Sequence, residues 1–270
     1  MRQIGSAANP RLKALRKLLH SSQERKRTGL SLLDGIHLVT AYCDNVGVPQ
    51  QVAISRSGLA DPDIAALLAK IPRVEPLVLS DSLFKQLSPV TTPTGIVAVV
   101  QTPRPQPVPA ALDACVMLEA IQDPGNLGSI LRSAAAAGMR HVLLSEHSVH
   151  AWSPRVLRAG MGAHFVINIY EFADLVEAAR AFPGRVIATR QQASRSVCDA
   201  DLTGGIALLF GNEGAGLSRE LLSVAHEVVA IPMPGKVESI NVAAAAAVCL
   251  FERVRQLRAN DERGTMNAER

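Results

Sequence analysis

Short apolar runs alternate with amphipathic stretches through the first part of the chain. Leucines at helical spacing predict a helix over residues 10–20. The other elements expected in this half are strands at 30–33, 51–55, 75–80 and 95–100 and helices near 36–43, 63–70 and 81–87. This order indicates a small α/β/α domain over residues 1–103.

The second half alternates apolar strands and helices more regularly. Strands are expected at 116–121, 141–145, 165–170, 185–189, 206–210 and 228–232, and helices near 127–137, 154–159, 173–181, 218–225 and 240–257. This alternation is typical of a parallel sheet with helices on both faces, so we expect an α/β domain over residues 114–270. In such folds ligands bind beyond the carboxyl ends of the strands, which is where candidate residues are expected.

A proline-rich stretch separates the two halves. Residues 102–111 read TPRPQPVPAA, and their four prolines cannot continue a helix or a central strand. We therefore expect a stiff linker over residues 104–113.

Composition narrows the class of protein. The chain has 270 residues, 48% of them hydrophobic, which is enough for two domains with cores. No apolar run approaches the roughly 18 residues of a membrane span, and the first residues lack the apolar segment of a secretory signal. The cysteines are far apart and form no CxxC pair, which argues against a zinc site and a disulfide framework. A cytoplasmic, reduced protein without a bound metal is expected.

Positive charge is concentrated at the N-terminus. Residues 1–27 carry a net charge of +7, whereas the rest of the chain carries −3. A basic end on a slightly acidic body is typical of proteins that bind a phosphate backbone, although a solvated helix face would show the same charge. The low aromatic content, 3%, favours phosphate and shape contacts over base stacking for any RNA. The candidate RNA-binding residues are Arg11, Lys13, Arg16, Lys17, Arg25, Lys26 and Arg27.

The first of three candidate loops follows the strand at 116–121. Its sequence, DPGNLG, opens a helix in which Asn126 is expected as the N-cap and Gly138 as the glycine after the C-terminus. Arg132 then falls in the second helical turn, close to the positive end of the helix. Neither helix boundary requires this arginine, which suggests that it binds a phosphate or a group that becomes anionic.

Two further loops follow later strands. LFGNEGAGLS, residues 209–218, places three glycines and Glu213 after a buried strand, and glycines allow a positive φ or a close approach of the backbone to a ligand. IPMPGKVESIN, residues 231–241, leads into an alanine-rich helix and offers Ser239 and Asn241 as alternative N-caps. The P-loop pattern GxxxxGK and the dinucleotide pattern GxGxxG are both missing, so a P-loop NTPase is excluded and no Rossmann turn is expected.

Together the three loops resemble the motifs of one enzyme family, the SpoU (TrmH-like) branch of the SPOUT RNA methyltransferases. The segments that carry the resemblance are Asn126-x-Gly128-x-x-x-Arg132, Phe210-Gly-Asn-Glu-Gly214 and Ile231-Pro-Met-x-Gly235 with Ser239-Ile-Asn241. The first half resembles the family's substrate-binding domain, which is similar to the ribosomal L30e fold. That resemblance rests on NPRLKALRKL from Asn9, LLDGIHLV from Leu32 and TPTGIVAVV from Thr92, with Asp34 where a glutamate is common.

The resemblance implies a fold and an activity. It implies a C-terminal SPOUT domain with a trefoil knot, an N-terminal L30e-like domain that binds RNA, and a homodimer formed through the C-terminal domain. The implied reaction transfers a methyl group from S-adenosylmethionine to a ribose 2′-hydroxyl in structured RNA. We favour 23S ribosomal RNA, because an L30e-like domain is frequent in members that act on the large subunit. The alternatives are a tRNA substrate and a non-catalytic RNA-binding protein on this scaffold, and the missing GxGxxG disfavours a dehydrogenase-like enzyme.

The resemblance also implies roles for single residues. Arg132 would hold a phosphate or stabilise the developing alkoxide, since a guanidinium stays protonated and cannot serve as a base. Glu213 would orient Arg132 through a bidentate pair, and the glycines after the strand at 206–210 would be bare because the methyl donor lies against their backbone. The implied catalytic residues are Arg132, Asn126, Glu213, Ser239 and Asn241. The implied donor-binding residues are Gly211, Gly214, Gly216, Ile231, Met233, Gly235 and Ile240.

Overall fold

The structure is a computed structural model that describes residues 1–88 and 93–268, without the side chains of Arg2 and residues 261–268. Thr92, which opens one of the segments named above, lies outside the described residues. The chain divides into two compact units. The first comprises Met1–Arg104 and Trp152–Phe165, and the second comprises Pro105–Ala151 and Val166–Arg270.

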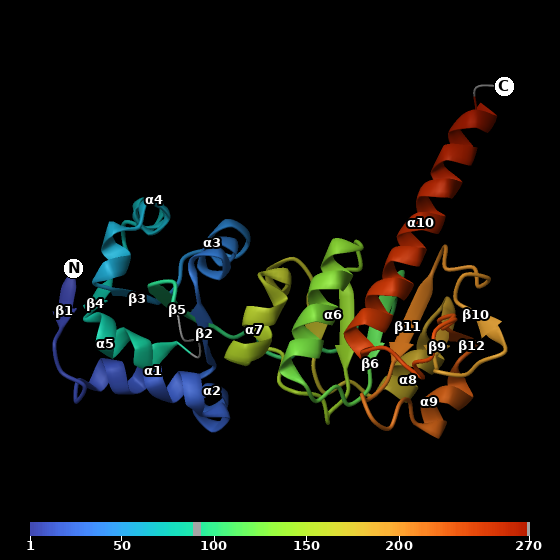
Figure 1. Cartoon of the computed structure of the whole chain (residues 1–270), viewed down its shortest axis with the longest axis horizontal. Helices are drawn as coiled ribbons and strands as arrows, with labels where there is room; N and C mark the ends of the chain where they lie inside the picture. The colour runs from blue at the N-terminus through green and yellow to red at the C-terminus, as the bar shows by residue number, and fades with distance from the viewer. Residues whose placement is uncertain (89–92, 269–270) are drawn as a thin grey trace. The chain divides into compact units, whose positions relative to one another are not determined.

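The first unit is built on a five-stranded mixed sheet (Figure 1). Its elements are β1 (Arg2–Ile4), α1 (Pro10–His20), α2 (Ser22–Thr28), β2 (Leu30–Asp34), α3 (Ile36–Asn45), β3 (Gln51–Ser55), η1 (Ser57–Ala60), α4 (Pro62–Lys70), β4 (Leu77–Leu79), α5 (Asp81–Phe84), η2 (Lys85–Leu87), β5 (Ile96–Gln101), α7 (Pro154–Gly160) and η3 (Ala163–Phe165). The strand order is β1-β4-β3-β5-β2, and β5 runs antiparallel to both of its neighbours. The predicted α/β/α character is confirmed, but β1 and α2 were not predicted.

Helix α1 shows how the sequence produces this unit. Asn9 caps the helix by accepting a hydrogen bond from the Arg11 amide at 2.9 Å, and Pro10 occupies the first helical position, where its missing N–H has no consequence. The four leucines that share one face of α1 are buried in a cluster with residues of the sheet and of α5, among them Leu32 of β2 and Phe84 of α5. Burial of this apolar face stabilises the helix more than its intrinsic propensity does.

The segment Trp152–Phe165 groups with the first unit, although the sequence pattern placed it in the second domain. Ser31 Oγ donates a hydrogen bond to the Trp152 carbonyl at 3.2 Å. Arg158 lies 3.5 Å from the buried carboxylate of Asp34, and the rings of Tyr42 and Phe165 meet edge to face with centroids 5.3 Å apart. These contacts join residues that are far apart in the sequence, so the local spacing of apolar residues could not predict them.

The second unit is built on a seven-stranded parallel sheet (Figure 1). Its elements are β6 (Ala114–Leu118), α6 (Pro124–Ala136), β7 (His141–Leu144), β8 (Asn168–Tyr170), α8 (Leu175–Ala181), β9 (Arg185–Thr189), β10 (Arg195–Ser196), β11 (Ile206–Phe210), α9 (Arg219–Val224), β12 (Glu227–Ala230) and α10 (Val242–Ala268). The strand order is β10-β12-β9-β11-β6-β7-β8. All five residues of β11 are buried, so the sheet is covered on both faces.

Helices supply that cover. Apolar residues of α8 and α9 join one set of alternating strand positions in a single cluster, which places these two helices on one face. Helices α6 and α10 pack against each other in front of the strands in Figure 1. The predicted parallel α/β class is confirmed, and the trefoil knot stays a prediction.

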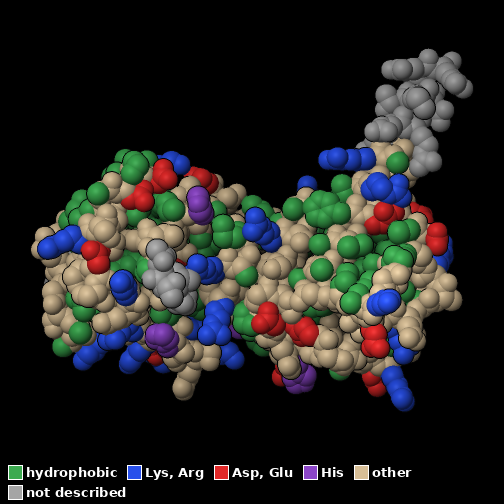
Figure 2. Space-filling model, viewed as in Figure 1, with side chains coloured by type: hydrophobic (Ala, Val, Ile, Leu, Met, Phe, Trp, Pro, Cys, Tyr) green, Lys and Arg blue, Asp and Glu red, His purple; other side chains and the backbone are tan. Residues whose placement is uncertain are grey.

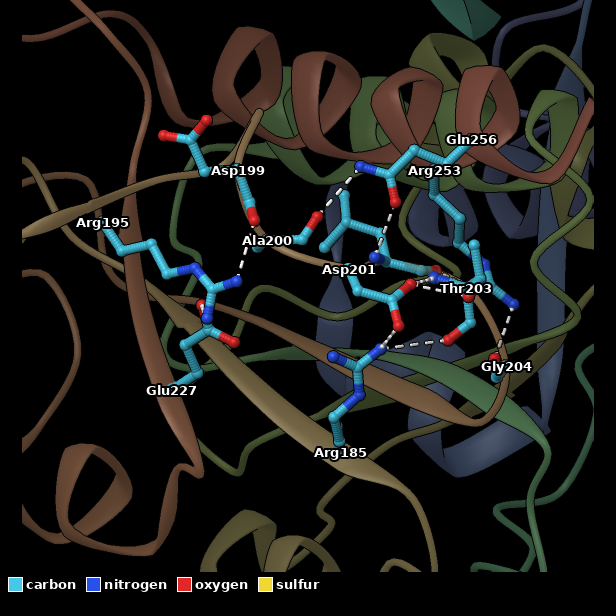
Figure 3. Close-up of polar contacts among 11 residues, drawn as sticks. Arg185, Arg195, Asp199, Ala200, Asp201, Thr203, Gly204, Glu227, Arg253 and Gln256 are labelled. Atoms are coloured by element: carbon cyan, nitrogen blue, oxygen red, sulfur yellow. Dashed lines mark hydrogen bonds and ion pairs between the residues drawn. The ribbon is translucent and has the colours of Figure 1, made fainter. Parts of the chain in front are cut away.

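The proline-rich stretch lies on the second unit. Residues 106–110, with Leu112 and α8, line a cavity of about 360 Å³, and Leu112 belongs to the buried cluster under α8. Helix α10 is attached to the turn that precedes β11, because the buried Arg253 of this helix donates to the carbonyls of Leu202 and Gly204 (Figure 3). Gln256 exchanges hydrogen bonds with the same turn, accepting from the Leu202 amide at 2.7 Å.

Candidate functional site

The three motif loops leave the sheet at one edge. They follow β6, β11 and β12, and because all strands of this sheet are parallel, their carboxyl ends lie at the same edge. Strands β6 and β11 are direct neighbours, with Leu118 opposite Phe210 at their ends. The first two loops are therefore adjacent because of strand order, although about 90 residues separate them in the sequence.

The first loop begins its helix earlier than expected. Asp123, not Asn126, is the N-cap of α6, and its Oδ1 accepts a hydrogen bond from the Asn126 amide at 2.8 Å. Pro124 occupies the first helical position, which suits its fixed φ. The expected capping role of Asn126 is wrong, and the correction leaves its side-chain amide available for other contacts. Gly138 follows the helix with a φ of +77°, as predicted.

Asn126 joins the three loops through its side chain. Its Nδ2 donates to Glu213 Oε1 at 3.0 Å, and its Oδ1 accepts from Asn241 Nδ2 at 2.8 Å. The amide is thus used at both ends, by one residue of the second loop and one of the third. A chain of hydrogen bonds whose members are all satisfied holds side chains in one arrangement.

Glu213 lies at one end of this chain of hydrogen bonds. It also accepts from the backbone amides of Gln122 at 3.3 Å and Asp123 at 3.1 Å. Burial acts to raise the pKa of the Glu213 carboxyl, but the hydrogen bonds from Asn126 and from backbone amides outweigh burial and hold the pKa below its usual value. The carboxylate therefore stays ionised and fastens the second loop to the start of α6.

Arg132 takes no part in this arrangement. It is the ninth of the 13 residues of α6, which puts it in the third turn rather than the second, and its side chain is exposed. Among the described residues it makes no hydrogen bond or ion pair, so the expected bidentate pair with Glu213 is not formed. Because the helix begins at Pro124, Arg132 is also farther from the positive helix end than expected.

Asn241 decides between the two alternative caps of α10. Its Oδ1 accepts from the amides of Ala243 at 2.8 Å and Ala244 at 3.4 Å, while its Nδ2 binds Asn126. One side chain therefore both caps the last helix and joins the third loop to the first. Ser239 is exposed.

Residues 210–219, which we call the glycine loop, contain three glycines. Contacts within the loop explain why two of them lack a side chain. A Cβ on Gly211 would overlap backbone atoms of Gly216 and Leu217. Gly216 has a φ of +71°, which side chains rarely adopt, and its backbone pairs with Asn212 in both directions. A ligand is therefore not needed to explain why Gly211 and Gly216 lack side chains, and their role in binding the donor stays a prediction. Gly214 differs, because a Cβ there would meet only Asn212 Oδ1, at an ordinary 3.6 Å.

Asn212 shapes this loop, although it was not among the expected site residues. Its Oδ1 accepts from the amides of Gly214 at 2.9 Å and Ala215 at 3.0 Å. Its Nδ2 donates to the carbonyl of Ala120 at 2.8 Å, where Ala120 has a φ of +52° and ends β6 earlier than predicted. An asparagine between glycines is a typical turn residue, which is the feature that could have identified it.

A cavity of about 830 Å³, which we call the motif cavity, opens beside these contacts. It is lined by segments that follow three strands, namely 189–192, 210–219 and 238–240, together with Leu222, Ile231, Met233, Val242 and Ala245. The lining combines apolar side chains with polar and charged ones and with the residues of the glycine loop, which suits a nucleoside-sized ligand. Of the residues expected to bind the donor, all but Gly235 line it, and of the expected catalytic residues Glu213 and Ser239 do.

Comparison with known proteins agrees with this geometry. Residues 113–251 match the model of the SpoU rRNA Methylase family, which covers the whole parallel sheet. The chain belongs to the SpoU rRNA methylase family. Residues 9–98 match the MRM3-like substrate binding domain.

Similar members of the family align over nearly the whole chain. The 23S rRNA (guanosine(2553)-2′-O)-methyltransferase RlmP of Bacillus subtilis is 30% identical over 93% of this chain and 98% of its own length. The SpoU methyltransferase AviRb from Streptomyces viridochromogenes, solved in complex with the cofactor AdoMet, has a TM-score of 0.81 at 29% identity, covering 93% of this chain and all of that one. An AdoMet-bound rRNA methyltransferase from Sinorhizobium meliloti has a TM-score of 0.82 at 28% identity, covering 95% of this chain and 98% of that one.

Residues 189–192 line the motif cavity of this family member but were not among the expected site residues. They comprise Thr189, the last residue of β9, and the polar residues Arg190, Gln191 and Gln192 directly after this buried strand. A polar run at the carboxyl end of a strand between two others that carry motifs was the pattern that could have identified them.

The basic residues of the first unit are not equivalent. Arg25 is buried, and its Nη1 donates to the carbonyls of Leu18 at 2.8 Å and Leu19 at 3.2 Å, at the end of α1. The inclusion of Arg25 among the RNA-binding residues is therefore wrong. Arg27 forms two hydrogen bonds with Glu24, Arg16 is half-buried, and the others are exposed: Arg11, Lys13, Lys17 and Lys26. Figure 2 shows Lys and Arg side chains along the lower edge of this unit, where Figure 1 places α1 and α2.

Among the residues that the structure describes, no group of His, Cys, Asp and Glu side chains is arranged to hold a metal ion. None of the described helices combines the length and apolar character of a membrane span.

Proposed function

We propose that the protein transfers a methyl group from S-adenosylmethionine to a ribose 2′-hydroxyl of 23S ribosomal RNA. The observation that carries this proposal is the hydrogen-bonded chain from Asn241 through Asn126 to Glu213, which fixes all three motif loops of a SpoU family chain beside one cavity. The named relative RlmP acts on 23S rRNA, and two solved relatives were determined with AdoMet. S-adenosylmethionine supplies an activated methyl group when it is bound.

The motif cavity fits this cofactor. Backbone of the glycine loop would face it, with Gly214 open to the cavity side and Leu217, Ile231 and Met233 as apolar lining. Because the turn is held by Asn212 and by the Asn212–Gly216 backbone pair, the loop is already shaped before a ligand binds. Gly235 does not line the motif cavity, and it would act by setting the path of the backbone in the third loop.

Arg132 is assigned to the reacting hydroxyl. A ribose hydroxyl is a weak nucleophile, so the site must hold it and lower the free energy of the alkoxide that develops as its proton leaves. A guanidinium that stays protonated and has no partner among the described residues is suited to holding a phosphate or that alkoxide. Asn126, Glu213 and Asn241 would keep the loops in place, and Ser239, on the cavity wall, would position substrate.

The first unit is proposed to bind the RNA. Its match to a substrate binding domain and the exposed side chains of Arg11, Lys13, Lys17 and Lys26 support phosphate contacts, with Arg16 and Arg27 beside them. Removal of residues 1–103 is a poor test of this role. It would uncover the segment Trp152–Phe165, whose Val156 and Leu157 are fully buried.

A homodimer through the second unit and a cytoplasmic location complete the proposal. Val248 and Phe251 on α10 are 42% and 48% exposed, and Figure 2 shows hydrophobic side chains gathered over α6 and α10. Exposed apolar patches are typical of protein interfaces. Sedimentation should therefore give twice the chain mass of 28.7 kDa.

The proposed activity is tested with the purified protein and tritium-labelled S-adenosylmethionine. The substrates are 23S rRNA and bulk tRNA from a strain in which the gene is deleted, because such RNA lacks the modification. We expect label in 23S rRNA at one ribose, located by mapping of 2′-O-methyl sites. Label in tRNA alone would replace the substrate, and an absence of label in both RNAs would support a non-catalytic RNA-binding protein.

A further inference from the structure

Two arginines on the wall of the motif cavity have no partner among the described residues. Arg190 follows β9 directly and Arg219 is the first residue of α9. Both line the motif cavity and both are exposed. Within residues 1–88 and 93–268, neither side chain makes a hydrogen bond or an ion pair.

Other arginines of the same sheet region are neutralised by the protein. Arg185 on β9 lies 3.0 Å from the Asp201 carboxylate, and Arg195 on β10 lies 2.9 Å from that of Glu227 (Figure 3). Arg190 lies between them in sequence, yet no carboxylate of the described residues pairs with it. The chain therefore provides partners for the arginines that support the fold and leaves the one on the cavity wall free.

Arg219, like Arg190, stands at a position where its charge does not support the fold. A cation at the first residue of a helix faces the positive end of the helix dipole, so it does not stabilise α9.

Two carboxylates line the cavity as well. Glu213 already accepts hydrogen bonds from Asn126 and from backbone amides, and Glu238 lies on the third loop. Neither of them pairs with Arg190 or Arg219 in the described part of the structure.

We propose that Arg190 and Arg219 bind an oxyanion at the wall of the motif cavity. A guanidinium binds a carboxylate and a phosphate through the same paired N–H groups, so the same site could hold either group. The inference rests on the proposed function, because that reaction brings two such groups to the cavity: the carboxylate of S-adenosylmethionine and a phosphate of the RNA. The two sources are separated by experiment.

The variants are Arg190→Gln, Arg219→Gln and the double variant, with Arg190→Lys to retain the charge. Arg180→Gln is the matched control, since Arg180 on α8 is also exposed, has no partner among the described residues and lies outside the motif cavity. Exposed arginines contribute little to stability, and thermal melts would verify that all variants fold.

The first measurement is calorimetric titration with S-adenosylmethionine in the absence of RNA, beside 5′-methylthioadenosine, which lacks the carboxylate. If the carboxylate is the ligand, the glutamine variants lose about tenfold or more in affinity for S-adenosylmethionine and none for 5′-methylthioadenosine. The second measurement is binding of a 23S rRNA transcript across a salt series. If a phosphate is the ligand, each glutamine substitution lowers the log–log salt slope by about 0.7–0.9 and leaves donor affinity unchanged.

Either pattern supports the oxyanion pair, and Arg190→Lys, which keeps the charge but not the paired N–H groups, should retain only part of the affinity. Donor affinity and salt slope equal to those of Arg180→Gln would overturn it. A failure of the proposed function is a different result, because there the wild-type protein itself would transfer no methyl group to RNA, whatever the variants bind.

Discussion

The glycine loop of the second unit and the basic helices of the first unit use polar side chains in opposite ways. Around the loop, Asn126, Asn212, Glu213 and Asn241 are all hydrogen-bonded to one another or to backbone. On α1 and α2 most of the cations point into solvent, and Arg25 alone is turned inward to bind backbone carbonyls. A site for a small ligand gains from side chains that are fixed in advance, whereas a surface for a polyanion needs charge more than fixed geometry.

The largest expected effect is at Arg132 on α6, which is exposed and has no partner among the described residues. Arg132→Ala should lower methyl transfer by about 10²–10⁴-fold, since the variant loses a group that stabilises developing charge. Affinity for S-adenosylmethionine should stay close to wild type, because Arg132 does not line the motif cavity. A tritium-methyl assay and calorimetry measure the two quantities. Turnover near the wild-type rate would remove Arg132 from the reaction.

Substitutions at two glycines of the glycine loop test its stability and its ligand binding separately. Gly211→Ala should lower the free energy of unfolding by about 1–3 kcal/mol, because the added Cβ meets the backbone of Gly216 and Leu217. Gly214→Ala should leave stability unchanged, since a Cβ has room there. If the donor lies against this backbone, Gly214→Ala nevertheless weakens donor binding. Unchanged affinity in Gly214→Ala would show that the donor does not approach this residue.

The same separation applies to the basic helices. Arg25→Gln should lower the free energy of unfolding by about 1–3 kcal/mol, because the carbonyls of Leu18 and Leu19 lose a charged donor. Lys13→Gln and Lys17→Gln should leave stability unchanged and lower the log–log salt slope of RNA binding by about 0.7–0.9 each. Urea denaturation and RNA binding across a salt series provide the two readouts. An unaltered slope in the double lysine variant would contradict a role of α1 in binding phosphate.

The smallest expected effect is a pH dependence at Glu213. Its pKa in the folded protein lies below 4.5, so its hydrogen bonds contribute stability that is fully present above pH 4.5 and is lost as pH falls through the folded pKa. Thermal unfolding of the wild type and of Glu213→Gln should therefore differ most above that pH and converge below it. A difference that stays constant across the pH series would show that the ionised carboxylate is not what holds the loop.

Local patterns in the sequence were sufficient for the elements and for the motif residues. The leucine spacing predicted α1 within its observed bounds, and the apolar runs predicted β9 and β11. Short elements with little periodicity, such as β1 and β10, were missed, since two or three residues cannot show a repeat. The motif loops were identified because helix caps, glycines and strand ends are properties of adjacent residues.

Tertiary structure alone decided what those residues contact. Asp123 rather than Asn126 caps α6, and this choice freed the Asn126 amide to join Glu213 and Asn241 across about 90 and 115 residues of sequence. Likewise, Arg25 and Lys26 are neighbours with the same charge, yet only Arg25 is buried. The sequence by itself determined which residue types stand at strand ends and helix starts, because those preferences are local. Which of them bond to each other depends on strand order and packing, which bring distant segments together.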